Sequence, residues 1–74
     1  MLTKYIYNEQ DITTDILFKI EDVTSIIAEK EGVRFEDAYL KFLNSKAYKL
    51  LQKTSSLMWA ESAGFIVDEY YRFM

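Results

Sequence analysis

The sequence has no cysteine, no histidine and no proline, and only two glycines among its 74 residues. Without cysteine no disulfide can form, and without cysteine or histidine a structural zinc site lacks its usual ligands. Two separate glycines cannot build a phosphate-binding loop. The commonest general base and the commonest activated nucleophile of enzymes are also missing. We therefore expect no enzyme, no cofactor and no metal site, and a fold held together by packing.

Long apolar runs are missing as well. The longest runs, such as residues 16–18, are far shorter than the roughly 20 residues that cross a bilayer. Residues 1–6 lack the apolar core of a signal peptide, and acidic residues follow them. Half of the residues are apolar and 28% are charged, as is typical of a folded globular protein. These features predict one small cytoplasmic domain over residues 1–74.

Apolar residues recur at helical spacing from residue 14 onward. The clearest stripe steps by four, three and four residues: Ile16, Ile20, Val23 and Ile27. It predicts a first helix over residues 15–31, with Thr14 as its N-cap and Gly32 in the left-handed region after its end. Residues 1–13 show no such pattern. A strand there would have no partner in a helical chain, so we expect a flexible arm or an irregular half-turn.

Three more helices are predicted, over residues 35–43, 46–52 and about 61–72, with a polar turn at 54–56 and an apolar turn at 57–60. Their expected buried side chains are Phe35, Ala38, Tyr39, Phe42, Tyr48, Leu51, Phe65 or Ile66, Tyr70 and Phe73. The second and third helices are too short for a long parallel bundle. The fold class is therefore predicted to be all-α, a small irregular or orthogonal bundle of about four helices.

Aromatic residues are unusually abundant, with six Tyr, five Phe and one Trp. Each carries about 150 to 250 Å² of surface, which is more than so small a core can bury completely. We expect some of them to form a protein interface, because Tyr and Trp are enriched in protein contacts. The candidates lie at the chain ends, in the apolar turn or off the periodic stripes: Tyr5, Tyr7, Trp59, Tyr71 and Phe73.

Charge is unevenly distributed along the chain. Residues 1–33 carry a net charge of −4, residues 34–53 carry +3 and residues 54–74 carry −2, which gives −3 in total. Lys46, Lys49 and Lys53 have spacings of three and four and form one basic stripe on a helix. Together with the helix-turn-helix-like segment 34–53, this stripe is the feature that suggests DNA binding. The net acidity opposes it, because the DNA backbone is negative.

Two stretches resemble a known pattern. Residues 44–51 read NSKAYKLL, residues 57–62 read LMWAES, and Phe65 and Ile66 follow. The pattern is similar to that of short uncharacterised bacterial helical proteins of a domain-of-unknown-function family, some encoded beside toxin-like ADP-ribosyltransferase genes. Many of those proteins have a proline where this chain has AG at 63–64. The resemblance implies a helical fold and an interaction or neutralising role, with no catalytic residues.

Two functions follow as hypotheses. The favoured one is a non-enzymatic protein-protein interaction module that forms a homo-oligomer or docks onto a larger bacterial protein. The alternative is a small DNA-binding or regulatory accessory protein that uses residues 34–53. No membrane partner is expected.

Overall fold

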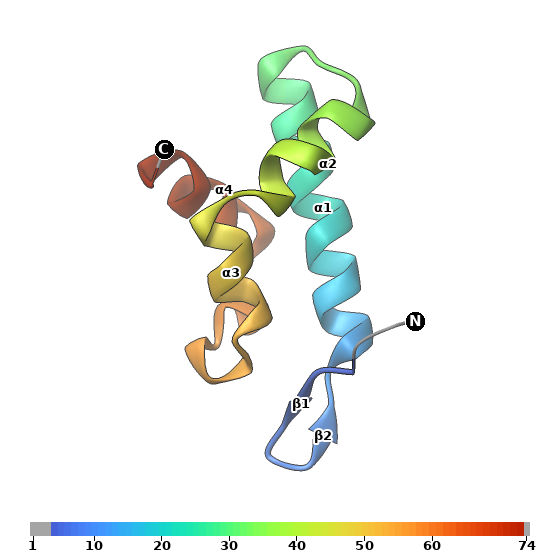
Figure 1. The fold of residues 1–74 in the computed structure, drawn as a ribbon, viewed down its shortest axis with the longest axis vertical. Coiled ribbons are helices and arrows are strands. Elements are labelled where there is room, and N and C mark those ends of the chain that lie inside the picture. The colour runs from blue at the N-terminus through green and yellow to red at the C-terminus, as the bar shows by residue number, and fades with distance from the viewer. Residues whose placement is uncertain (1–3, 74) are drawn as a thin grey trace.

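The computed structural model describes residues 4–73, and Figure 1 shows them as a bundle built along one long helix. The elements are a hairpin of β1 (Ile6–Tyr7) and β2 (Gln10–Asp11), four α-helices and two short 3₁₀ turns. The helices are α1 (Thr13–Glu31), α2 (Phe35–Leu43), α3 (Lys46–Gln52) and α4 (Ala63–Arg72), and the turns are η1 (Thr54–Ser56) and η2 (Met58–Ala60). The predicted all-α bundle of about four helices is confirmed.

The N-terminal segment corrects the prediction that a strand there would lack a partner. β1 pairs antiparallel with β2, with Tyr7 opposite Gln10. Asn8 and Glu9 make the two-residue turn between them, with φ values of 49° and 67°. Two successive positive φ angles are typical of the type I′ turn that suits a tight hairpin. Residues 6–11 are therefore a hairpin at one end of the molecule.

The hairpin also determines where α1 begins. Thr13 N donates a hydrogen bond to Asp11 Oδ1 at 3.0 Å, and Thr13 Oγ1 accepts one from Tyr5 N at 2.8 Å. The helix therefore starts at Thr13 with Ile12 as its N-cap residue. The predicted N-cap at Thr14 is wrong, because the cap is provided by contacts with the hairpin rather than by a side chain one residue before the helix.

Local sequence signals determine the other helix ends. Gly32 follows α1 with φ of 64°, as predicted. Ser45 Oγ accepts a hydrogen bond from Tyr48 N at 3.2 Å, and Ser62 Oγ accepts one from Phe65 N at 3.1 Å. Both serines are N-caps, which satisfy backbone donors that the helix itself leaves free. α2 and α3 have the predicted boundaries.

Replacing Gly32 by alanine is expected to lower the free energy of unfolding by about 1 kcal/mol, because a Cβ is disfavoured at positive φ. Nothing lies within 4 Å of the added methyl group, so the effect comes from the backbone alone. Gly64→Ala in α4 is the matched control, and it should stabilise by up to about 1 kcal/mol because alanine is the better helix former. Urea titrations of both variants measure the two effects, and a stabilised Gly32→Ala protein would contradict the prediction.

The core lies where all four helices meet. Its fully buried large side chains come from every helix: Ile16, Val23, Ile27, Phe42, Leu51, Ile66 and Val67. Tyr70 and Met58 close it at the sides.

Three aromatic residues predicted to be buried are exposed instead. Phe35, Tyr39 and Phe73 are 42%, 39% and 42% exposed. Because α2 has only nine residues, it covers α1 with Ala38 and Phe42 and leaves its flank open.

Candidate protein interface

The five aromatic residues predicted to form an interface do not share one surface. Tyr7 and Trp59 pack together with ring centroids 5.4 Å apart and join the hairpin to η2. Trp59 Nε1 also donates a hydrogen bond to the Thr54 carbonyl at 2.9 Å. Tyr5 Oη accepts one from Gln52 Nε2 at 2.9 Å. These three rings are half-buried against the core and connect distant segments.

Tyr71 has a structural role in a three-residue contact, which we call the Glu31 junction. Glu31, in the last turn of α1, accepts a hydrogen bond from Tyr71 Oη at 2.9 Å. Its other carboxylate oxygen lies 2.8 Å from Lys41 Nζ on α2. One carboxylate thus joins α1 to both α2 and α4.

The pKa values in the Glu31 junction shift as these contacts require. The hydrogen bond from Lys41, and then that from Tyr71, lowers the pKa of Glu31. Burial, and then the hydrogen bond to Glu31, raises the pKa of Tyr71 to about 12. The Glu31 contact also raises the pKa of Lys41. The contacts stabilise the charged carboxylate and ammonium and the neutral phenol, so the junction is intact at neutral pH.

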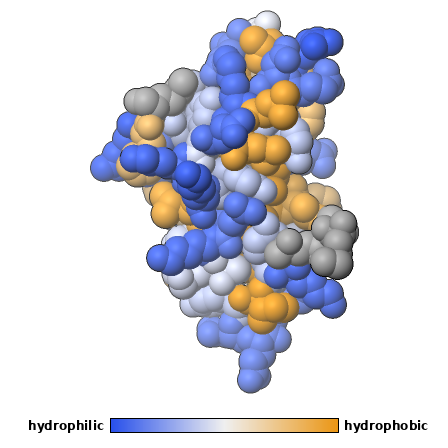
Figure 2. Space-filling view, viewed as in Figure 1, coloured by the Kyte–Doolittle hydropathy of each residue, from blue (hydrophilic) through white to orange (hydrophobic). Residues whose placement is uncertain are grey.

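Five large apolar side chains lie exposed on α1 and α2, between 39% and 62% accessible. They are Leu17, Phe18, Phe35, Tyr39 and Leu40, and we call them the α1–α2 surface. Figure 2 shows hydrophobic side chains gathered over α2 and beside α1. Such a group is larger than the single exposed apolar residues that any protein carries. The α1–α2 surface is the best candidate for an interface in the described part of the chain.

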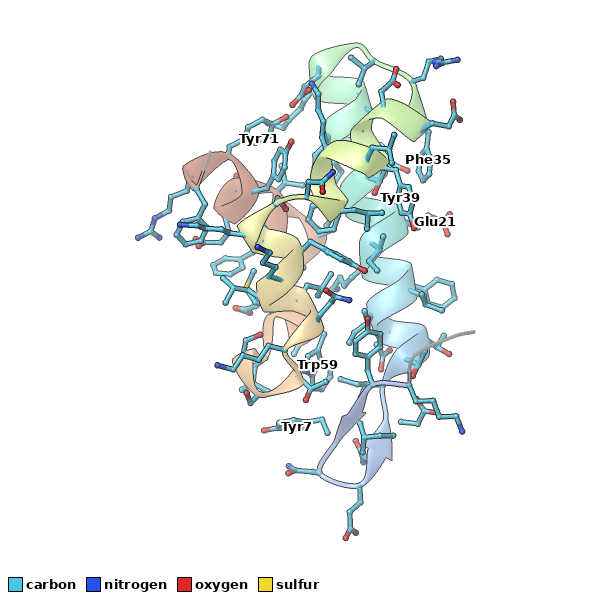
Figure 3. The ribbon with its side chains drawn as sticks, in the orientation of Figure 1. Tyr7, Glu21, Phe35, Tyr39, Trp59 and Tyr71 are labelled. Atoms are coloured by element: carbon cyan, nitrogen blue, oxygen red, sulfur yellow. The ribbon has the colours of Figure 1, made fainter. Side chains whose placement is uncertain are left out.

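The α1–α2 surface contains a stacked aromatic pair. The rings of Phe35 and Tyr39 are stacked, with centroids 6.3 Å apart and planes 12° from parallel. Figure 3 draws Glu21 of α1 on the same side of the molecule as these two rings. Tyr48 of α3 is half-buried, and burial, followed by the phenols of Tyr5 and Tyr39, raises its pKa. Aromatic rings held by their neighbours lose little entropy when a partner covers them.

The sequence contains a signal for part of this surface. Phe18 lies about 200° around the helix from Ile16, so a helix that buries Ile16 must expose Phe18. The exposure of Phe35 and Tyr39 has no such signal, because both lie beside the buried residues of α2. Among the predicted interface residues, Phe73 is the one that is exposed.

The predicted basic stripe is on the outer face of α3. Lys46, Lys49 and Lys53 are exposed, and within residues 4–73 they form no ion pair. Lys46 also borders an open groove of about 450 Å³ between α2, α3 and α4, lined by Lys41, Asn44, Ser45, Lys46, Tyr70 and Phe73. The stripe therefore adds positive charge to the outer face of α3 and to one wall of this groove.

Among residues 4–73, no three acidic side chains are grouped so that they could hold a metal ion. No helix in the same part of the chain has the length and apolar character needed to cross a membrane.

Comparisons of the chain with protein-family models, with curated proteins and with solved structures find no match, so the family resemblance stays a prediction.

Proposed function

We propose that this protein is a non-enzymatic protein-interaction module and that the α1–α2 surface is where its partner binds. The observation that supports this is the grouping of five large apolar side chains, each at least 39% exposed, on two helices that pack against each other. The core is complete without them. A partner that covers these side chains would remove apolar surface from water, which contributes roughly 25 cal/mol per Å² of apolar area.

The chemistry of the surface supports binding of a protein rather than of a small molecule. None of its five residues lines the groove between α2, α3 and α4, whereas small-molecule sites are concave. It combines stacked aromatic rings with aliphatic side chains, and the acid Glu21 lies on the same side of the molecule. Aromatic anchors beside polar groups are typical of the centres of protein interfaces.

The test compares capture of protein partners by the tagged chain and by variants. Phe35→Ser and Leu40→Ser should lose the bound protein, another copy of the chain included. Phe65→Ser is the matched control, since Phe65 is 41% exposed on α4 and outside the α1–α2 surface. Equal capture by all three variants, with circular dichroism showing that each is folded, would contradict the proposal.

DNA binding is the second candidate, supported by the exposed lysines of α3. Duplex binding through these lysines should weaken steeply with salt, by a slope of about 0.9 for each phosphate contact. The net charge of −3 opposes it, so we expect no measurable binding even at low ionic strength. Salt-sensitive binding that is lost when Lys46, Lys49 and Lys53 are all changed to alanine would favour this candidate instead.

A further inference from the structure

We infer that the partner on the α1–α2 surface is a second copy of the chain, related by a two-fold axis parallel to the long axis of the molecule. This inference rests on the proposed function and adds the identity of the partner and the geometry of the complex. Three features support it: the opposite charges on the two sides of the surface, the stacked aromatic pair and the area of the face.

The two sides of the surface carry opposite charge. On the α1 side, Figure 3 draws Glu21 near the Phe35–Tyr39 pair, and α1 carries five acidic residues and two lysines. On the α3 side, Lys46, Lys49 and Lys53 are exposed, and α3 has no acidic residue. A two-fold axis that runs between the acidic side and the basic side of the face places the acidic side of each copy against the basic side of the other. The face is therefore complementary to itself, as a two-fold interface requires.

The aromatic pair fixes where the axis passes. A two-fold axis parallel to the long axis keeps each residue at its own height, so an axis that passes beside Phe35 and Tyr39 brings them against the same residues of the second copy. Aromatic residues at the centre of an interface are the usual source of its binding energy. An axis at right angles to this one, in the plane of the interface, would place lysine against lysine and is disfavoured.

The molecule has enough surface for such a dimer. A stable interface needs about 800 Å² from each partner. The chain measures 39 × 26 × 18 Å, and its broad face, seen in Figure 2, is large enough to provide that area. A chain this small, with no disulfide, also gains stability from association.

Charge reversal tests both the partner and the geometry. Glu21→Lys and Lys49→Glu should each raise the dimer dissociation constant by roughly 10-fold or more, because the axis makes each substitution act twice. An equimolar mixture of the two variants should dimerise as well as the wild type, because each new lysine then faces a new glutamate. Asp68→Lys is the control, since Asp68 is exposed on α4 and the change in charge is the same as in Glu21→Lys. Sedimentation velocity at roughly 1 to 100 µM measures the wild type, the three variants and the mixture.

Each possible result either supports the two-fold dimer or overturns it. Weakened single variants with recovery in the mixture support the two-fold dimer. A wild type that stays monomeric over this range overturns the inference, and so does a dimer that neither charge reversal weakens. The proposed function is tested separately, because Phe35→Ser would still abolish capture of a different protein if the partner were not a second copy.

Discussion

Phe42→Ala is expected to unfold the protein at room temperature. The Phe42 ring is fully buried and packs edge-on against Tyr48 and Tyr70, with centroid separations of 5.6 and 6.1 Å. Removing it leaves a cavity where α2, α3 and α4 meet, a change that lowers the free energy of unfolding by about 3 to 5 kcal/mol. A single core in a chain this short seldom supplies more than about 3 to 5 kcal/mol in total. The substitution therefore removes most of the stability.

Far-UV circular dichroism and urea titration measure this effect. Phe65→Ala is the matched control, because Phe65 is 41% exposed and the chemical change is the same. It should alter the free energy of unfolding by no more than about 0.5 kcal/mol. A folded Phe42→Ala protein with a urea midpoint close to that of the control would show that the core does not depend on this ring.

The helices could be predicted because their signals are local. Phe42 is four residues after Ala38, and Leu51 four after Ala47, so each short helix buries one stripe. Ser45 and Ser62 cap the helices that follow them, and Gly32 ends α1. Each of these features lies within a few residues of the boundary that it determines. Periodicity and capping rules therefore gave α2 and α3 their correct boundaries.

The hairpin could not be predicted because its turn lacks the usual residues. Tight two-residue turns favour Asn-Gly, but here glutamate occupies the second position at a φ of 67°. Tertiary contacts stabilise the hairpin, including the bond from Gln52 to Tyr5, which are 47 residues apart. Contacts over such distances leave no periodic pattern in the sequence.

The α1–α2 surface was not among the interface residues predicted from the sequence, for a related reason. Periodicity identifies the side of α2 that contains Phe35, Tyr39 and Phe42, but it cannot tell how much of that side α1 covers. α2 lies on α1 so that Phe42 is buried and its two aromatic neighbours remain exposed. Partial exposure depends on the angle between two helices, and no periodic pattern in a single sequence indicates that angle.

Glu31→Gln is expected to lower the free energy of unfolding by about 1 to 1.5 kcal/mol at neutral pH. The substitution removes a carboxylate that accepts hydrogen bonds from Tyr71 at 2.9 Å and Lys41 at 2.8 Å. Hydrogen bonds to charged groups contribute more than neutral ones, at about 1.5 to 3 kcal/mol each. The net loss is expected at or below the low end of this range, because glutamine still accepts a hydrogen bond and the Lys41 side chain is 52% exposed. Glu29→Gln, an exposed neighbour on α1, is the control and should have little effect.

The pH dependence distinguishes the Glu31 junction from a general effect of charge. Folding lowers the pKa of Glu31 below its ordinary value of 4.5, so its stabilisation is present above that value and is lost as the pH falls through the folded pKa. The difference between wild type and Glu31→Gln should therefore disappear in acid.

Folding raises the pKa of Tyr71 from 10.0 to about 12, so the contribution of Tyr71 to stability is present below pH 10.0 and is lost as the pH rises toward 12. In Glu31→Gln that pKa should fall but stay above 10.0, because burial is the larger cause. Urea titrations across pH, with tyrosinate absorbance for Tyr71, measure both effects, and a difference that persists undiminished in acid would show that the charge of Glu31 is not what joins the three helices.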